Sequence, residues 1–155
     1  MKISYTHQFR LPLDTVWRGM QDEGVLKKAI PGCQSFSRVA DQLYHAEMGL
    51  SVGPVKGVFT CEVRQEDQEE PVFYRLLVKG KGGPGEIDAV ADMRLSPEGD
   101  GVRLDCAAEV QVSGMLASVG QRVMNGVAKL VMGQFFKAAE KEMGLLFSHS
   151  QSKEG

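Results

Sequence analysis

The sequence predicts a single α+β domain in which a curved antiparallel sheet wraps around one long C-terminal helix. Three observations predict this class. The 155 residues suffice for one domain with a sizeable core but not for two. Between residues 34 and 111 apolar and polar residues alternate, and after residue 114 the apolar period becomes 3.6 residues. A sheet with one apolar face must bury it, and the helix is the element that can cover it.

The first thirty residues predict one strand and two short helices. The strand covers residues 3–9, where apolar and polar side chains alternate. The first helix begins near Pro12, because proline is favoured at helix starts. The second helix spans Glu23–Ala29 and ends before Pro31 and Gly32, which interrupt helices. The expected order is therefore strand, helix, helix.

The middle of the chain predicts six further strands joined by tight turns. Each expected turn is rich in Gly, Pro, Asp or Glu, and the turns fall at residues 40–42, 53–54, 66–71, 82–85 and 97–101. Each strand keeps one polar face, as expected for an antiparallel sheet with water on one side. Together with the first strand, this predicts a seven-stranded curved sheet.

A single helix is expected from about Met115 to Phe147. The side expected to face the sheet carries Leu116, Val119, Val123, Val127, Leu130, Val131, Gln134 and Ala138. The opposite side carries a sparse apolar line of Met132, Phe136, Met143 and Phe147, which we expect to contact a partner protein, a second copy or a membrane surface. We therefore expect one domain over residues 1–147 and a polar tail over residues 148–155.

Composition and motif spacing exclude several functions. Eighteen basic and twenty acidic residues give a net charge of −2, which argues against a nucleic-acid partner. The sequence has no apolar window long enough to span a membrane and no signal-peptide pattern, so a cytoplasmic location is expected. Three cysteines without a CxxC pair and three histidines without ligand spacing predict no metal site and no disulfide.

No catalytic residue is predicted. The segment Gly80–Gly85 matches GxGxxG, but Pro84 and the alternating residues after it predict a strand where a dinucleotide site needs a helix. A glycine-rich hairpin is the better interpretation, and Gly82 and Gly85 at this turn are candidates for contact with a partner, together with Met132 and Phe136 of the helix.

The predicted interior contains small and flexible side chains. Inward positions of the last two strands include Ala89, Ala91 and Ala108, and the expected helix contains glycines, each of which costs about 1 kcal/mol relative to alanine. We predict an apolar cavity, the alternative being a core filled by Met and Ala. The expected lining is Ile30, Met48, Leu50, Phe59, Met93, Ala108, Leu116, Val123, Val127 and Leu130. His7 and Gln134 are candidates for polar contacts with a ligand.

Four segments resemble the carbon monoxide dehydrogenase G-subunit family, a member of the helix-grip group that includes START, polyketide cyclase and Bet v 1-like proteins. They are Leu26 with Ile30-Pro31-Gly32-Cys33, then residues 51–59, Gly80-Lys81-Gly82 and residues 108–122. The resemblance covers about residues 1–147. It implies a helix-grip fold around an apolar cavity, without catalysis by the protein itself.

The resemblance also implies a function. Family members are associated with molybdenum-containing hydroxylases of the carbon monoxide dehydrogenase type, as membrane-recruitment factors that bind a quinone and carry electrons towards the respiratory chain. We therefore expect a non-catalytic accessory protein that holds an apolar, quinone-like molecule without covalent attachment, peripheral at the inner face of the membrane. Two alternatives remain: an assembly or docking subunit that acts by protein contact, and a cyclase- or lyase-like enzyme of the same fold.

Overall fold

The computed structural model describes residues 1–154, with side chains described up to Leu146. The elements are β1 (Lys2–Phe9), α1 (Leu13–Gly19), α2 (Glu23–Ala29), β2 (Cys33–Ala40), β3 (Leu43–Val52), β4 (Val55–Glu69), β5 (Phe73–Gly82), β6 (Gly85–Glu98), β7 (Gly101–Ser113), the 3-10 helix η1 (Gly114–Ser118) and α3 (Gln121–Glu154). The strands form one antiparallel sheet in the order β1-β7-β6-β5-β4-β3-β2. This arrangement confirms the predicted fold class and the predicted element order.

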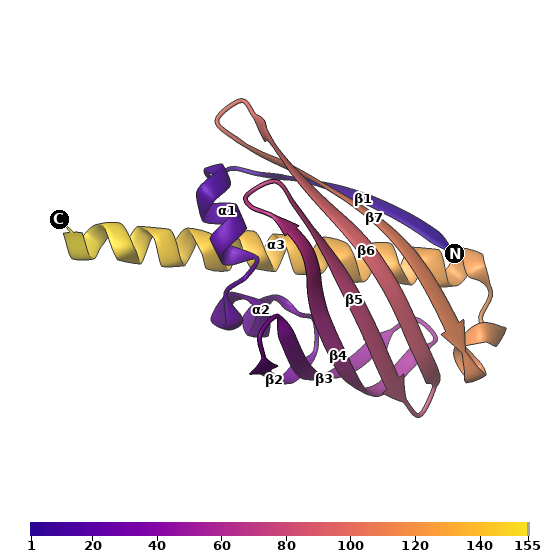
Figure 1. Cartoon of the computed structure of the whole chain (residues 1–155). Coiled ribbons are helices and arrows are strands. Elements are labelled where there is room, and N and C mark those ends of the chain that lie inside the picture. The colour runs from indigo at the N-terminus through magenta and orange to yellow at the C-terminus, as the bar shows by residue number, and fades with distance from the viewer. Residues whose placement is uncertain (155) are drawn as a thin grey trace.

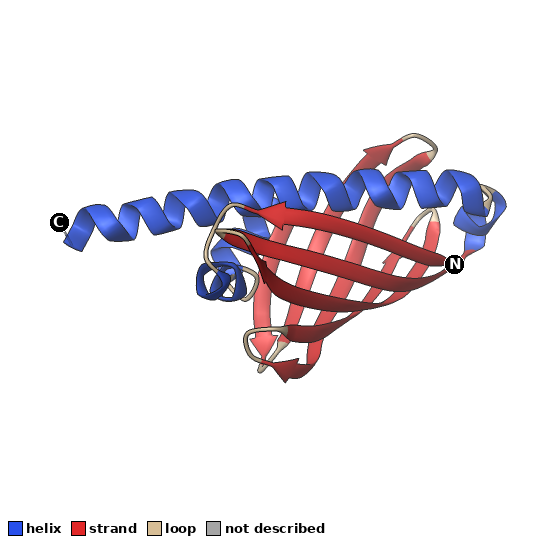
Figure 2. Cartoon of the chain, turned by 90° about the horizontal axis from the view of Figure 1, so that it is seen from above, coloured by secondary structure: helices blue, strands red, loops and turns tan. Residues whose placement is uncertain are grey.

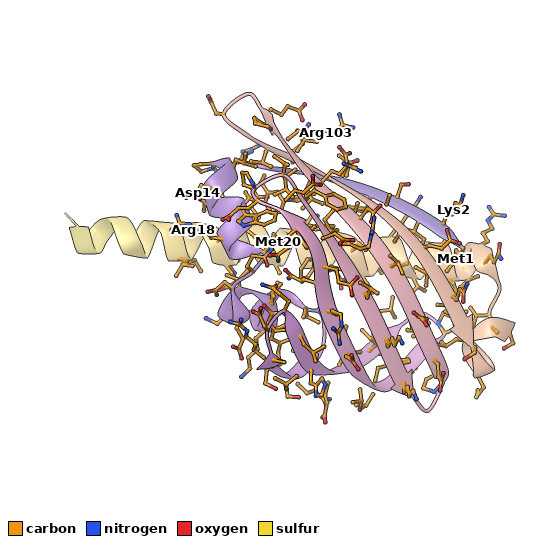
Figure 3. All side chains as sticks on the ribbon, viewed as in Figure 1. Met1, Lys2, Asp14, Arg18, Met20 and Arg103 are labelled. Carbon is orange, nitrogen blue, oxygen red and sulfur yellow. The ribbon has the colours of Figure 1, made fainter. Side chains whose placement is uncertain are left out.

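The sheet curves around α3, which runs along its concave side and extends beyond it at the C-terminal end (Figures 1 and 2). The two short helices lie at one end of this grip (Figure 1). On α1, Asp14 and Arg18 form an ion pair on the exposed face, whereas Met20 at the end of the helix is buried (Figure 3). The start of α2 is capped by Asp22, whose carboxylate accepts a hydrogen bond from the Val25 amide at 2.9 Å.

The long helix has different bounds from those predicted. Residues from Gly114 to Ser118 form a 3-10 turn, and α3 begins only at Gln121 because Gly120 adopts a φ of +96°, which a right-handed helix cannot contain. At the other end the backbone stays helical to Glu154, past the predicted end at Phe147. The segment from 148 to 154 contains neither proline nor glycine to stop it.

The face of α3 that packs against the rest of the protein also differs from the prediction. Phe136, Ala139 and Met143 are at most 2% exposed, whereas Val123 and Leu130 are 45% and 52% exposed. The helix is therefore rotated, with its aromatic and methionine side chains facing inward. These side chains bury more apolar area than valine, and burial of area decides which face of a helix packs. Phe147 lies outside the described side chains.

The interior contains two apolar clusters. One lies under α1 and the C-terminal half of α3 and includes Phe9, Trp17 and Phe136. The other lies under α2, the start of α3 and the three strands at one edge of the sheet, β2, β3 and β4, which are called the edge strands below. It includes Phe59 and Leu116. The Phe135 side chain packs against both clusters. A ligand site in the interior would therefore be lined by residues that lie between the two clusters.

Candidate functional site

The middle of the concave face of the sheet carries alanine, valine and leucine side chains that remain half-buried under α3. The strand register places them in two neighbouring rows, Val78–Ala89–Val110 and Leu76–Ala91–Ala108. Side chains on one face of a sheet at these positions pack beside each other and point the same way. Fully packed interiors leave such residues buried, so their residual exposure indicates unfilled space between the sheet and the helix.

Helix α3 covers this space and packs closely against β1. A Cβ atom added at Gly133 would lie 2.8 Å from the Tyr5 hydroxyl oxygen, so the glycine lets the helix approach the strand. By contrast, a Cβ atom added at Gly126 would meet nothing within 4 Å. The two glycines therefore differ, because a side chain at position 133 would have to displace the Tyr5 hydroxyl whereas one at position 126 would displace nothing.

Most of the predicted lining residues lie together in the structure. Ile30, Met48, Leu50, Phe59, Leu116 and Val127 belong to the cluster under the edge strands, Met93 belongs to the other cluster, and Ala108 lies in the half-buried rows. The prediction for Val123 and Leu130 is wrong, because both are exposed on the outer side of α3. Their error follows from the rotation of the helix. Whether the remaining residues bind a ligand stays a prediction.

A pocket of about 400 Å³ lies where β7, η1 and the first turn of α3 meet. Its lining is Met1, Val110, Gln111, Val112, Leu116, Ala117, Gly120, Gln121 and Met124. Val112, Leu116 and Met124 are shared with the apolar cluster under the edge strands, so the pocket borders the interior. Its volume lies within the range of small-molecule sites. We interpret it as the mouth of the space under α3.

A second hollow, of about 530 Å³, lies at the end of β1 beside the β6–β7 hairpin. Its lining includes Arg10, Glu98 and Asp100, which are all exposed. It lies at the opposite end of β1 from Met1, away from the mouth described above.

His7 is already engaged within the protein. Its Nε2 atom lies 2.8 Å from a carboxylate oxygen of Glu140 on α3, and the other oxygen of Glu140 accepts a hydrogen bond from the Arg10 amide. The imidazole also stacks near Phe136, with ring centroids 5.8 Å apart. His7 therefore ties β1 to α3, and a ligand would have to compete with Glu140 for it.

Gln134 is not in the interior. It is exposed on α3, so the prediction that it offers a polar contact inside the cavity is wrong for the same reason as for Val123. Buried side chains with a polar group among the described residues include instead Gln65, which is 4% exposed, and Tyr74, which is 1% exposed. The Tyr74 hydroxyl has no hydrogen-bond partner among the described residues, and burial raises its pKa, so it stays neutral.

Sequence reasoning missed Tyr74 because it follows Phe73, and two adjacent aromatic residues leave the inward face of a strand ambiguous. The register resolves the ambiguity, because Tyr74 pairs with Met93 and shares its inward side. Counting every second residue back along β5 from Gly80 would have placed Tyr74 on the inward face.

The predicted partner contacts are corrected in part. Phe136 is 2% exposed and stacks on Tyr5, so it is a core residue and not a docking residue. Gly85 closes the β5–β6 hairpin against η1: it has a φ of +140°, and a Cβ atom there would overlap the Ser113 carbonyl. Gly82 and Met132 are half-buried, and nothing in the structure tests them as contacts.

Among the described residues no helix is long and apolar enough to cross a membrane. Within the same part of the chain no three residues among His, Cys, Asp and Glu gather as a metal site would require.

Comparison with solved structures identifies the fold. A conserved protein from Geobacillus kaustophilus is 32% identical, with a TM-score of 0.89 over 93% of this chain and 95% of that one. A START superfamily protein from Mycobacterium smegmatis is 16% identical, with a TM-score of 0.71 over 94% and 98% of the two chains. The Zhui aromatase/cyclase from Streptomyces sp. R1128 is 11% identical, with a TM-score of 0.63 over 93% of each chain.

The last two likenesses show the START-like fold alone, and a shared fold does not establish a shared function. No curated protein matches the sequence. The model of one family, CoxG, which is the G-subunit of carbon monoxide dehydrogenase, matches residues 7–144, and this is most of the described domain. The chain therefore belongs to the CoxG family, the carbon monoxide dehydrogenase G-subunit family.

Proposed function

We propose that this protein is a non-catalytic accessory protein of a carbon monoxide dehydrogenase-type molybdenum hydroxylase, and that it holds an apolar, quinone-like molecule between the sheet and α3. Membership of the family supports the association with that class of enzyme. The observation that carries the binding proposal is the set of half-buried alanine, valine and leucine residues under the helix, because their residual exposure supports a space that a ligand could occupy.

A ligand in this space would be recognised mainly by shape and apolar contact. The adjoining side chains include Met48 and Met93, whose flexible thioethers adapt to irregular ligands. The pocket beside η1 provides the entrance, since it borders the interior cluster. An aromatic head with a carbonyl group and an apolar tail fits this chemistry.

The test is to fill the space. We propose Ala89→Phe, which places a ring on the inward face of β6, with Val90→Phe as the matched control on the outward face of the same strand. Titration with a short-tailed naphthoquinone is followed by quenching of Trp17, which is the single tryptophan of the chain. We expect saturable quenching for the wild type and for Val90→Phe, and a loss of affinity of at least about tenfold for Ala89→Phe.

Two results would contradict the binding proposal. One is the absence of saturable quinone binding in the wild type. The other is an Ala89→Phe protein whose thermal midpoint falls far below that of Val90→Phe, because strong overpacking would mean that the space is already filled.

A second feature supports contact with a membrane surface. The outer face of α3 carries four exposed cations and two exposed apolar side chains: Arg122, Lys129, Lys137, Lys141, Val123 and Leu130. None of these cations forms an ion pair with a described side chain, whereas Glu140 and Glu142 of the same helix are engaged by His7 and Lys28. We propose that this face binds anionic lipid headgroups, with Val123 and Leu130 entering the interface.

Vesicle co-sedimentation tests the membrane contact. We expect binding to vesicles containing phosphatidylglycerol but not to pure phosphatidylcholine, and weaker binding as salt rises. Each cation near an anionic surface contributes about 1 kcal/mol, so reversing Lys129 and Lys137 to Glu should lower the partition by at least tenfold. Lys79→Glu, on an exposed sheet position, is the control. Equal loss in the control would contradict a role for α3.

A further inference from the structure

The side chains of four glutamines converge at the end of the grip that carries the two short helices (Figure 1). The Nε2 atom of Gln68 on β4 lies 2.8 Å from the Oε1 atom of Gln65 on the same strand. It also lies 3.0 Å from Oε1 of Gln21, between α1 and α2, and 3.1 Å from Oε1 of Gln42, in the β2–β3 turn. Three carbonyl oxygens from three separate segments therefore surround one point. Neither the space under α3 nor the outer face of that helix uses this glutamine cluster.

The four amides do not satisfy one another. An amide nitrogen carries two hydrogens, so Nε2 of Gln68 cannot donate a full hydrogen bond to each of the three oxygens around it. In addition, Nε2 of Gln21 is enclosed and has no hydrogen-bond partner among the described residues. Gln65 is 4% exposed, so bulk water does not reach most of its side chain. Buried polar groups are nearly always paired, and a bound ion is one explanation of an exception.

The backbone is bent where it brings these side chains together. Gln42 and Asp67 have φ values of +57° and +50°, and in the part of the chain that the structure describes they are the two non-glycine residues with positive φ. This conformation is uncommon for residues with a side chain. Gln42 belongs to the cluster, and Asp67 precedes Gln68 where the pairing of β4 with β5 shifts register, as at a bulge that redirects a side chain. Two such conformations beside one cluster point to a functional reason for the convergence.

We propose that the three carbonyl oxygens form a site for a monovalent cation, potassium or ammonium, which takes the position of the Gln68 Nε2 atom. The oxygens lie 2.8, 3.0 and 3.1 Å from that position. Magnesium and calcium bind oxygen at about 2.0–2.6 Å, so a larger ion with a lower charge fits better. Potassium is bound by carbonyl oxygens in channel filters, and ammonium has enough N–H groups to donate to all three oxygens. Gln68 is exposed, so its side chain is free to leave the position to the ion.

The surroundings favour a positive charge. The β4–β5 hairpin around Gln68 carries four carboxylates, on Glu66, Asp67, Glu69 and Glu70. Each lies within two residues of Gln68, so its Cα atom is at most about 7.6 Å away, inside the Debye length of about 8 Å at physiological salt. Among them only Asp67 forms an ion pair with a described side chain, that of Arg75 at 2.8 Å. The remaining negative charges therefore lower the free energy of a cation at the glutamine cluster.

The experiment is thermal unfolding in potassium, ammonium or choline chloride at one ionic strength, followed by circular dichroism. A cation that binds only the folded protein raises the thermal midpoint, and the rise follows the occupancy of the site. We expect potassium or ammonium to raise the midpoint by at least about 3 °C over choline at about ten times the half-saturating concentration. The ion that half-saturates the site at the lower concentration is the better ligand.

Two variants of the cluster should give opposite results. Gln42→Asn withdraws one carbonyl by a methylene group and introduces a residue that tolerates positive φ, so it should weaken binding by at least about tenfold. Gln68→Ala removes the amide that competes with the ion, so the rise should remain and should half-saturate at a lower concentration. Gln134→Ala, at an exposed position of α3, is the matched control and should respond like the wild type.

Three results would overturn the cation site. One is a wild-type midpoint that is the same in potassium, ammonium and choline. Another is a response that Gln68→Ala loses as completely as Gln42→Asn, because Gln68 would then be the fixed centre of the cluster and not the occupant of an ion's position. The third is a wild-type response in Gln42→Asn, which would make the rise a general effect of salt. The readout needs neither quinone nor membrane, so its failure is distinct from failure of the proposed function.

Discussion

Replacing Tyr74 by Phe should stabilise the protein. The Tyr74 hydroxyl is enclosed, its side chain is 1% exposed, and no described group forms a hydrogen bond with it. Burying a hydroxyl without a partner costs about 1–3 kcal/mol, and Phe keeps the ring that packs edge-to-face on Trp17 at 5.6 Å. We expect the free energy of unfolding to rise by about 1 kcal/mol, which corresponds to about 3 °C in the thermal midpoint of a chain of this size.

The same substitution has a signature in alkali. Burial raises the pKa of Tyr74 above its ordinary value of 10.0. The folded protein therefore retains a proton that the unfolded chain releases, and the wild type loses stability as pH rises above about 10, by up to about 1.4 kcal/mol per pH unit. Tyr74→Phe removes this loss, so the difference in stability between variant and wild type should widen above pH 10.

Urea unfolding at pH 7 and at pH 10.5, followed by circular dichroism, measures both effects. Tyr44→Phe is the control at pH 7: Tyr44 is also buried in the sheet, but its hydroxyl is not among the enclosed unpartnered atoms of the described residues. A Tyr74→Phe protein that is less stable than the wild type at pH 7 would refute the reasoning, because the hydroxyl would then have a partner in the folded protein.

Three further substitutions test the packing of α3 and of the core. Phe136→Ala should lower the free energy of unfolding by about 3–5 kcal/mol in urea, since Phe136 is a core residue. A loss below about 1 kcal/mol would mean that the Phe136 side chain is on the surface. Gly126→Ala should raise stability by about 1 kcal/mol through helix propensity, whereas Gly133→Ala should gain less because its Cβ meets Tyr5; equal gains would contradict the close approach. Burial raises the pKa of Cys106 to about 12. The stability that this protonated thiol contributes is therefore complete below about pH 9 and is lost as pH rises toward about 12. Cys106→Ala should reduce this alkaline loss of stability in unfolding measured from about pH 8 to 11.

The fold was predictable because the strands and turns carry local signals. Alternation along each strand and turn residues between strands identified all seven strands, and Pro31 correctly marked the end of α2. The order of strands follows largely from hairpin connectivity. The pairing of β1 with β7 is the exception, because it joins strands far apart in sequence. It is expected only indirectly, since all the strands must belong to the one sheet that covers the helix.

The rotation of α3 was not predictable from apolar periodicity alone. The helix carries apolar residues nearly all round, so counting valine and leucine favoured the side of Val123 and Leu130, whereas packing is decided by the larger Phe135, Phe136 and Met143. Most of the predicted lining residues were still correctly placed in the interior, because they lie on strands. On a strand, alternation leaves only two possible faces for each side chain.

The pairing of β1 with β7 has a consequence for how the protein is made. Lys2 lies opposite Glu109, so during synthesis β1 finds its neighbour only after more than a hundred further residues have been added to the chain. Until then β2–β6 can pair as successive hairpins, while β1 presents an unpaired edge to other nascent chains. The slowest folding step should therefore be the pairing of β1 with β7.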